Sequence, residues 1–316
     1  MSRAKPFPSP RLAPLPASHT PPPDVPLFST VSPGASTAIP VPSLLVKWSG
    51  LTDRGRVRAN NEDAFLALAF DGREVRYLGK TGEASLAGTE FLFAVSDGMG
   101  GAKSGEIASR LAVDRIAQLL PQHFAHATAD DLTGRSEVLG KLFTSIHHDL
   151  LVLGASYEEC AGMGATLSLC WLTPRRIHFG HVGDSRIYAL PAAGGITQLT
   201  DDHNHVGWLR RKGQINEREA RTHPLRHSLH RAIGAGIQSV DPHIGTFACG
   251  PGDRFLICSD GVIDGLWDRH LDELVRDQTG SPTGQSTAQR IVAEAVEKSG
   301  RDNATALVFE LCQPSA

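Results

Sequence analysis

Residues 94–101 read AVSDGMGG and place one acidic residue, Asp97, between an apolar run and a segment of three glycines and a methionine. The run before Asp97, FLFAV, has the composition of a buried strand. Asp-Gly is a common turn dipeptide and Gly100-Gly101 can open a following helix, so a simple turn is one interpretation. In the other, backbone without side chains approaches a ligand, and a carbonyl such as that of Gly98 becomes a ligand itself.

Carboxylates stand at the ends of four strand-like runs. Glu62 and Asp63 open DAFLALAF, Asp97 closes EFLFAVS, Asp260 follows FLICS, and Asp302 precedes ATALVFEL. One Asp in such a position is typical of a turn or a helix cap. Four together, with the triplet SDG used twice, indicate a shared site. Because converging carboxylates repel one another unless a cation neutralises them, and because oxygen ligands select hard ions, the pattern predicts Mg²⁺ or Mn²⁺ rather than zinc.

Two arginines lie close to these acidic positions. Arg58 precedes Glu62 by four residues, and its planar guanidinium suits the oxygens of a phosphate group. Arg186 follows Asp184 in HVGDSRIYAL, at a predicted tight turn. Two interpretations of Arg186 stay open, a buried ion pair with Asp184 that holds the turn and a catalytic role.

The chain divides into a tail and one domain. Residues 1–43 hold twelve of the twenty prolines, mixed with Ser, Ala and Thr, which predicts a disordered or polyproline-like tail. This tail is either passive or a proline-rich ligand. Residues 44–316 form the predicted catalytic domain, within which residues 71–88 have no assigned role.

Strand-like and helical runs alternate in blocks along this domain. The helical spacing of apolar residues predicts helices within 105–120, 136–153 and 287–300. The predicted strands are short and rich in Val, Ile, Leu and Phe, and they lie within 43–51, 63–70, 90–96, 165–173, 176–183, 185–190, 253–259 and 304–311. Strands followed by two consecutive helices and then more strands indicate an α+β fold, with antiparallel sheets and helices on one face.

Composition excludes several classes of protein. A net charge of −3 gives no electrostatic argument for nucleic acid or an anionic membrane as a partner. No stretch approaches the roughly 18 apolar residues of a membrane span, and the start MSRAKPFPSP lacks the apolar core of a secretory signal, so we expect a cytoplasmic protein. The five cysteines are widely spaced without a CxxC pair, which predicts buried thiols rather than zinc ligands or disulfides. We expect a monomer.

Residues 50–310 resemble the metal-dependent type 2C protein Ser/Thr phosphatases, in particular the bacterial branch. Seven motifs in family order carry the resemblance: GRVRANNED (55–63), VSDGMGG (95–101), GMGAT (162–166), GHVGDSRIY (180–188), LTDDH (199–203), CSDG (258–261) and RDNAT (301–305). The resemblance implies a four-layer α-β-β-α sandwich, in which two antiparallel sheets are flanked by helices.

The resemblance also implies a centre of two Mg²⁺ or Mn²⁺ ions. Asp97 would bridge both ions, Asp260 and Asp302 would complete one site, and Glu62 with the Gly98 carbonyl would complete the other. A water that bridges the two ions would attack the phosphorus of phosphoserine or phosphothreonine, because two divalent ions acidify a shared water.

Three further roles follow from the resemblance. Asp63 would orient the waters of the metal centre, and Arg58 would clamp the substrate phosphate. A weaker third ion would use Asp202. Residues 203–229, the flap segment, would overhang the active site, and its basic residues either steer a phosphopeptide or form a solvated helix face.

The leading function is therefore a phosphoprotein phosphatase that acts on targets of a bacterial Ser/Thr kinase. The alternative is a non-catalytic relative that binds phosphoproteins, a class in which metal ligands are usually lost. A carboxylate-metal nuclease is a third class, disfavoured because the chain shows no basic bias and no aromatic-basic interleaving.

Overall fold

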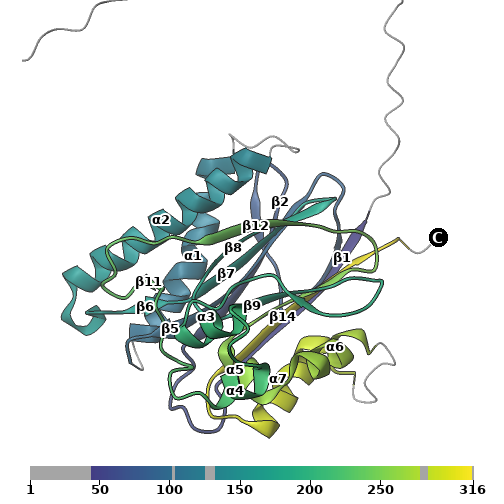
Figure 1. Ribbon diagram of the computed structural model, residues 1–316. Coiled ribbons are helices and arrows are strands. Elements are labelled where there is room, and N and C mark those ends of the chain that lie inside the picture. The colour runs from purple at the N-terminus through teal and green to yellow at the C-terminus, as the bar shows by residue number, and fades with distance from the viewer. Residues whose placement is uncertain (1–43, 102–103, 125–131, 278–283, 315–316) are drawn as a thin grey trace, which may run out of the picture. The chain divides into compact units, whose positions relative to one another are not determined.

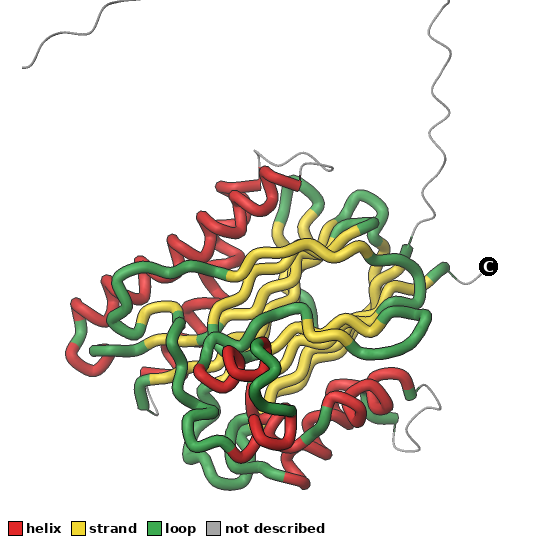
Figure 2. Tube along the Cα trace, in the orientation of Figure 1, coloured by secondary structure: helices red, strands yellow, loops and turns green. Residues whose placement is uncertain are grey.

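The computed structural model describes residues 44–101, 104–124, 132–277 and 284–314, and the chain from Pro42 onward forms one compact unit. The predicted proline-rich tail, residues 1–43, lies outside the described residues. Within the described unit, two layers of strands lie between two layers of helices (Figures 1 and 2). The predicted α-β-β-α sandwich is confirmed.

The first sheet has six antiparallel strands in the order β10-β9-β13-β14-β1-β4. These strands are β1 (Leu45–Asp53), β4 (Thr81–Ser85), β9 (Arg186–Leu190), β10 (Thr197–Gln198), β13 (Arg254–Cys258) and β14 (Ala304–Cys312). Its centre joins the two ends of the domain, because β14 pairs with β1 from Leu45↔Cys312 to Asp53↔Ala304.

The second sheet has eight strands. Six follow the order β11-β6-β5-β7-β8-β12, and β2 pairs with β5 and with β3. Their bounds are β2 (Asp63–Phe70), β3 (Val75–Tyr77), β5 (Glu90–Met99), β6 (Gly164–Ala165), β7 (Leu167–Leu172), β8 (Arg176–Val182), β11 (Ile233–Gly234) and β12 (His243–Ala248).

Helices cover the outer face of each sheet. The long helices α1 (Ser104–Phe124) and α2 (Leu132–Ser156) pack on the eight-stranded sheet, and α5 (Asp260–Gly265), α6 (Asp268–Arg276) and α7 (Thr287–Lys298) pack on the six-stranded sheet. The remaining helical turns are η1 (Glu158–Cys160), α3 (His205–Arg211) and α4 (Glu217–Thr222). The sequence-based expectation of helices on one face therefore holds for each sheet taken separately, while the domain as a whole has helices on both sides.

Alternation along the strands separates three hydrophobic layers. On β5, Phe91, Phe93 and Val95 point into the core between the sheets, whereas Leu92 and Ala94 point toward α1 and α2. Side chains of a strand alternate between faces with a period of two, so Asp97 continues the row that points between the sheets. The fold thus directs this carboxylate to the end of the inter-sheet core.

Local patterns predicted the long elements better than the short ones. Strand β2 has the predicted bounds, and α1, α2 and α7 overlap the predicted helices. Residues 71–88 supply β3 and β4, and β4 extends the six-stranded sheet by pairing with β1. Helices α5 and α6 were not predicted, because six and nine residues are too short to show a helical period.

Two further observations concern disulfide bonds and membrane-spanning helices. All five cysteines are free; Cys160, Cys170 and Cys258 are buried as predicted, whereas Cys249 and Cys312 are only partly buried. None of the described helices combines the length and apolar character needed to span a membrane.

Candidate metal centre and active site

Four inward-facing rows of side chains end at one edge of the inter-sheet core. On β2 and β5 the rows end at Asp63 and Asp97, which lie opposite each other in the register of the two strands. On the other sheet, the rows of β13 and β14 reach Ser259 and Thr305, and hydroxyls of both donate to Asp63 Oδ2 at 2.7 and 2.6 Å. The strand ends named by the sequence pattern therefore meet in space.

A cavity of about 500 Å³ opens at this edge. Six of the eight predicted site residues line it, namely Arg58, Glu62, Asp97, Gly98, Asp260 and Asp302. These residues come from the loop before β2, the end of β5, the start of α5 and the turn before β14. The predicted convergence of residues from distant parts of the chain is thus present.

Gly98 sits where no side chain fits. A Cβ atom built there would lie 2.0 Å from the carbonyl oxygen of Gly105 in the first turn of α1. The Gly98 amide also donates to the Glu62 carbonyl at 3.1 Å. Gly100 and Gly101 have φ of 123° and 91°, a region that favours glycine. The glycines after Asp97 therefore allow close contact with α1 and backbone angles that other residues rarely adopt.

Asn303 holds the loop that carries Arg58 and Glu62. Its side-chain oxygen accepts from the Glu62 amide at 2.7 Å, and its side-chain nitrogen donates to the carbonyls of Arg54 and Asn60 at 2.9 and 3.0 Å. Asn303 had no predicted role of its own, although it lies in the motif RDNAT. The motif thus contributes the Asp302 carboxylate to the cavity. Its next residue, Asn303, holds in place the loop that carries Arg58 and Glu62.

Arg58 lies on the cavity wall beside Asp302. Arg58 Nη2 donates to Asp302 Oδ2 at 2.6 Å, and the Arg58 side chain is half exposed. This hydrogen bond raises the pKa of Arg58, so the guanidinium stays charged. A fixed cation at the cavity mouth can bind an anionic ligand in the cavity.

Asp63 lies behind the cavity wall rather than on it. It is buried, and burial raises its pKa to about 7, against the opposing effect of hydrogen bonds from Thr305 and Ser259. Its Oδ1 has no hydrogen-bond partner among the described residues. The side chain ties β2 to the ends of β13 and β14 and leaves one oxygen free.

Electrostatics in the cavity favour a bound cation. Burial, followed by the charges of Asp63 and Asp260, raises the pKa of Asp97 well above its usual value. The buried Oδ1 of Asp260 has no hydrogen-bond partner among the described residues. As the side chains stand, no three His, Cys, Asp or Glu among the described residues form a ready set of metal ligands. The all-oxygen donors, their mutual repulsion and the unpaired oxygens nevertheless fit hard divalent ions.

Asp184 and His227 are cavity residues that the sequence analysis missed. Asp184 is buried, accepts from Asn204 Nδ2 at 3.2 Å, and has a pKa raised to about 8, chiefly by burial and then by the charge of Asp260. His227, in the flap segment, places Nδ1 3.3 Å from Asp260 Oδ2. The motif GDSR contains Asp184, but the sequence analysis considered this residue only as a possible ion-pair partner of Arg186.

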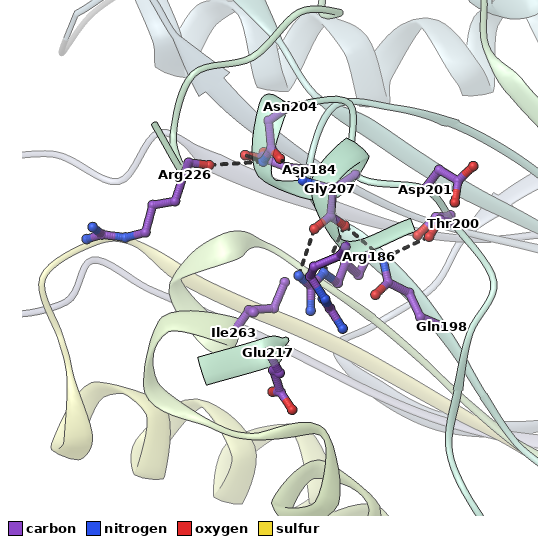
Figure 3. Close-up of polar contacts among 12 residues, drawn as sticks. Asp184, Arg186, Gln198, Thr200, Asp201, Asn204, Gly207, Glu217, Arg226 and Ile263 are labelled. Atoms are coloured by element: carbon purple, nitrogen blue, oxygen red, sulfur yellow. Dashed lines mark hydrogen bonds and ion pairs between the residues drawn. The ribbon is translucent and has the colours of Figure 1, made fainter. Parts of the chain in front are cut away.

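Arg186 pairs instead with Asp202. Its Nε and Nη2 donate to the two carboxylate oxygens of Asp202 at 2.9 and 2.7 Å, and Gln198 donates to the same carboxylate at 2.7 Å. Arg186 and Gln198 are labelled in Figure 3. Asp202 does not line the 500 Å³ cavity. Of the two interpretations left open for Arg186, a buried ion pair is present, but its partner is Asp202 rather than Asp184. Asp202 lines a smaller cavity of about 50 Å³ that it shares with Asp260, and there Arg186 neutralises its carboxylate.

Comparison with known proteins agrees with this geometry. The family model described as Protein phosphatase 2C matches residues 80–298. The chain belongs to the protein phosphatase 2C family. The matched span contains Asp97, Gly98 and Asp260, whereas Arg58 and Asp302 lie outside it and join the same cavity through the fold.

Two bacterial relatives are similar to most of this chain. The chain is 31% identical over 272 residues to the serine/threonine protein phosphatase PstP of Mycobacterium tuberculosis, which covers 85% of this chain and 46% of PstP. The chain therefore spans about half the length of that relative. It is 29% identical to the serine/threonine phosphatase stp of Listeria monocytogenes over 82% of this chain and 93% of that protein.

A solved structure extends the comparison to metals. The PstP catalytic domain, determined in complex with two manganese ions, superposes with a TM-score of 0.66 at 29% identity, over 85% of this chain and all of that one. The family membership and the sandwich fold thus rest on sequence and on structure.

Proposed function

We propose that the protein is a metal-dependent phosphatase that hydrolyses phosphoserine and phosphothreonine in proteins. The observation that carries the proposal is the single cavity lined by Arg58, Glu62, Asp97, Asp260 and Asp302, which come from strand ends and loops up to 244 residues apart in the chain. Membership of the protein phosphatase 2C family supports the same activity.

Two divalent ions, Mg²⁺ or Mn²⁺, fit the donor set of this cavity. Asp97 is the central ligand of the proposal, with Asp260 and Asp302 on one side and Glu62 with the Gly98 carbonyl on the other. When bound, such ions supply a water acidified enough to act as a nucleophile near neutral pH and neutralise charge on the phosphate. The PstP structure with two manganese ions supports this assignment.

The chain's own residues bind and orient the substrate. Arg58, held at the cavity mouth, pairs with phosphate oxygens and stabilises the charge that they carry in the transition state. Asn303 keeps Arg58 and Glu62 on one rigid loop. Asp63 stays behind the wall with one unpaired oxygen, which suits the proposed role of accepting a hydrogen bond from a water in the cavity.

A non-catalytic relative that binds phosphoproteins is the alternative. The full set of acidic cavity residues argues against it, because binding alone needs no cluster of repelling carboxylates. Release of phosphate from a chromogenic phosphoester with and without Mn²⁺ separates the two functions. We expect Asp97→Asn to lower kcat/KM at least about a thousandfold, since the loss of the shared ligand removes roughly 4 kcal/mol of transition-state stabilisation.

Asp241→Asn is the matched control, because this carboxylate is 79% exposed and pairs with Arg231 at the surface. The control should keep wild-type kcat/KM. Absence of Mn²⁺- or Mg²⁺-dependent turnover in the wild type would favour the binding function instead.

We further propose that the substrates are proteins phosphorylated by a bacterial Ser/Thr kinase in the cytoplasm. The support is the similarity to bacterial relatives named serine/threonine phosphatases. Comparing phosphoproteins in cells with and without the chain tests it, since the true substrates should gain phosphoserine or phosphothreonine when the chain is absent.

A further inference from the structure

Arg221 is one of the residues that hold the flap segment, residues 203–229, against helix α5. Arg221, in α4, donates through Nη1 to the Ile263 carbonyl and through Nη2 to the Leu266 carbonyl at 2.5 Å. Its guanidinium also lies 4.1 Å from the ring centroid of Trp267 and 3.0 Å from Glu217 in its own helix. Only 14% of the Arg221 side chain is exposed.

These contacts fall on the C-terminal end of α5. The last carbonyls of a helix have no partner within the helix, and that end carries partial negative charge. A guanidinium there satisfies two carbonyls at once and interacts favourably with the helix dipole. Arg221 therefore makes stronger contacts than an exposed surface pair would.

The N-terminal end of α5 carries Asp260, a residue of the proposed metal centre. The flap segment runs along this short helix from one end to the other. Arg226 Nε lies 3.9 Å from Asp264 Oδ1, and His227 Nδ1 lies 3.3 Å from Asp260 Oδ2. The space left between the flap segment and α5 is a cavity of about 50 Å³. Glu217 and Arg226 of the flap segment and Ile263 of α5, which line this cavity, are labelled in Figure 3. Two residues of the same segment, His227 and Leu229, then form part of the wall of the 500 Å³ cavity.

We propose that Arg221 is a positioning residue that docks the flap segment on α5 and thereby fixes the wall over which a phosphoprotein must lie. The kinetic part of this proposal rests on the proposed phosphatase function, and the docking part does not. A peptide on either side of the phosphorylated residue contacts that wall, whereas a small phosphoester occupies only the cavity. Loss of Arg221 therefore weakens ground-state binding of the larger substrate, which raises KM without lowering kcat.

The kinetic test compares Arg221→Ala, Arg221→Lys and Arg218→Ala with a phosphopeptide and with a chromogenic phosphoester, both in Mn²⁺. Arg221→Ala should raise KM for the phosphopeptide about fivefold to tenfold and leave kcat, and both constants for the small ester, within about twofold. Arg221→Lys keeps the charge but cannot reach two carbonyls with a fork, so its KM should lie between those of Arg221→Ala and the wild type.

Arg218→Ala removes the same charge from the same helix. The Arg218 side chain is exposed and makes no hydrogen bond or ion pair with the part of the chain that the structure describes. An equal rise in KM for Arg218→Ala would mean that charge steers the peptide, and it would overturn the docking role. An equal loss of kcat on both substrates in Arg221→Ala would also overturn it.

Hydrogen exchange measures the docking of the flap segment independently of enzymatic activity. In Arg221→Ala, amides of 205–222 should exchange at least about tenfold faster, while those of β5 and β14 keep their wild-type protection. Unchanged exchange in the flap segment would contradict the proposal. Faster exchange in a protein without phosphatase turnover would uphold the docking and refute only the proposed function.

Discussion

Gly98 shows how a single residue links the sequence pattern to the site. The sequence suggested that glycine after Asp97 lets the backbone approach a ligand. The structure adds a steric reason, because the space for a Cβ atom at Gly98 is filled by the Gly105 carbonyl at 2.0 Å. Glycine at this position therefore lets α1 begin directly against the strand that carries Asp97.

We expect Gly98→Ala to destabilise the protein by about 1–3 kcal/mol, because the extra methyl group must push α1 away from β5. It should also weaken Mn²⁺ binding, since Glu62 and Gly98 shift together. Gly140→Ala is the control, as Gly140 lies inside α2 and a Cβ there meets only Ile244 at an ordinary 3.7 Å. Urea unfolding should find the control unchanged or more stable by up to about 1 kcal/mol. Equal stabilities of the two variants would contradict the steric explanation.

At the scale of the elements, the ends of the strands were predictable from the sequence. The side-chain contacts between elements far apart in the chain were not. Alternation and apolar runs located β2, β5, β13 and β14, and hence Asp63, Asp97, Asp260 and Asp302. Sequence proximity failed for Arg186, which bonds to Asp202 rather than to its neighbour Asp184. Sequence proximity also gave no indication that His227 contacts Asp260, because the two residues are 33 positions apart in the chain. Such contacts depend on tertiary packing, which has no local period.

The gathered strand-end carboxylates predict how stability depends on pH in the metal-free protein. Burial raises the pKa of Asp63 to about 7 and that of Asp184 to about 8. A carboxyl whose pKa is higher in the folded state stabilises the fold while it is protonated, and that stability is lost as pH rises through the folded-state pKa. Between pH 6 and 8 the free energy of unfolding should therefore fall, by at most about 1.4 kcal/mol per pH unit for each such group.

Thermal unfolding in a chelator at pH 6, 7 and 8 measures this effect. Saturating Mn²⁺ should reduce or reverse the fall, because ions bind the ionised carboxylates. Asp184→Asn should flatten the metal-free profile near pH 8. A stability that does not fall from pH 6 to 8 in the chelator would contradict the raised pKa values of these carboxyls.

Considered as a whole molecule, the protein is a sandwich whose inter-sheet core ends in a polar edge. Rows of apolar side chains from both sheets fill the core. The rings of Phe93 and Phe309, for example, stack with their centroids 4.4 Å apart. The same rows then continue into acidic residues at one edge, so the rigidity of the core fixes the spacing of the carboxylates. The flap segment and α5 complete the wall on the remaining side.

The central claim is that this edge binds two divalent ions around Asp97. Anomalous diffraction from crystals grown with Mn²⁺ tests it directly, because manganese peaks are located without reference to activity. We predict two peaks in the 500 Å³ cavity, both about 2.0–2.3 Å from Asp97 carboxylate oxygens. A single peak away from Asp97, or no peak in the cavity at saturating Mn²⁺, would contradict the account.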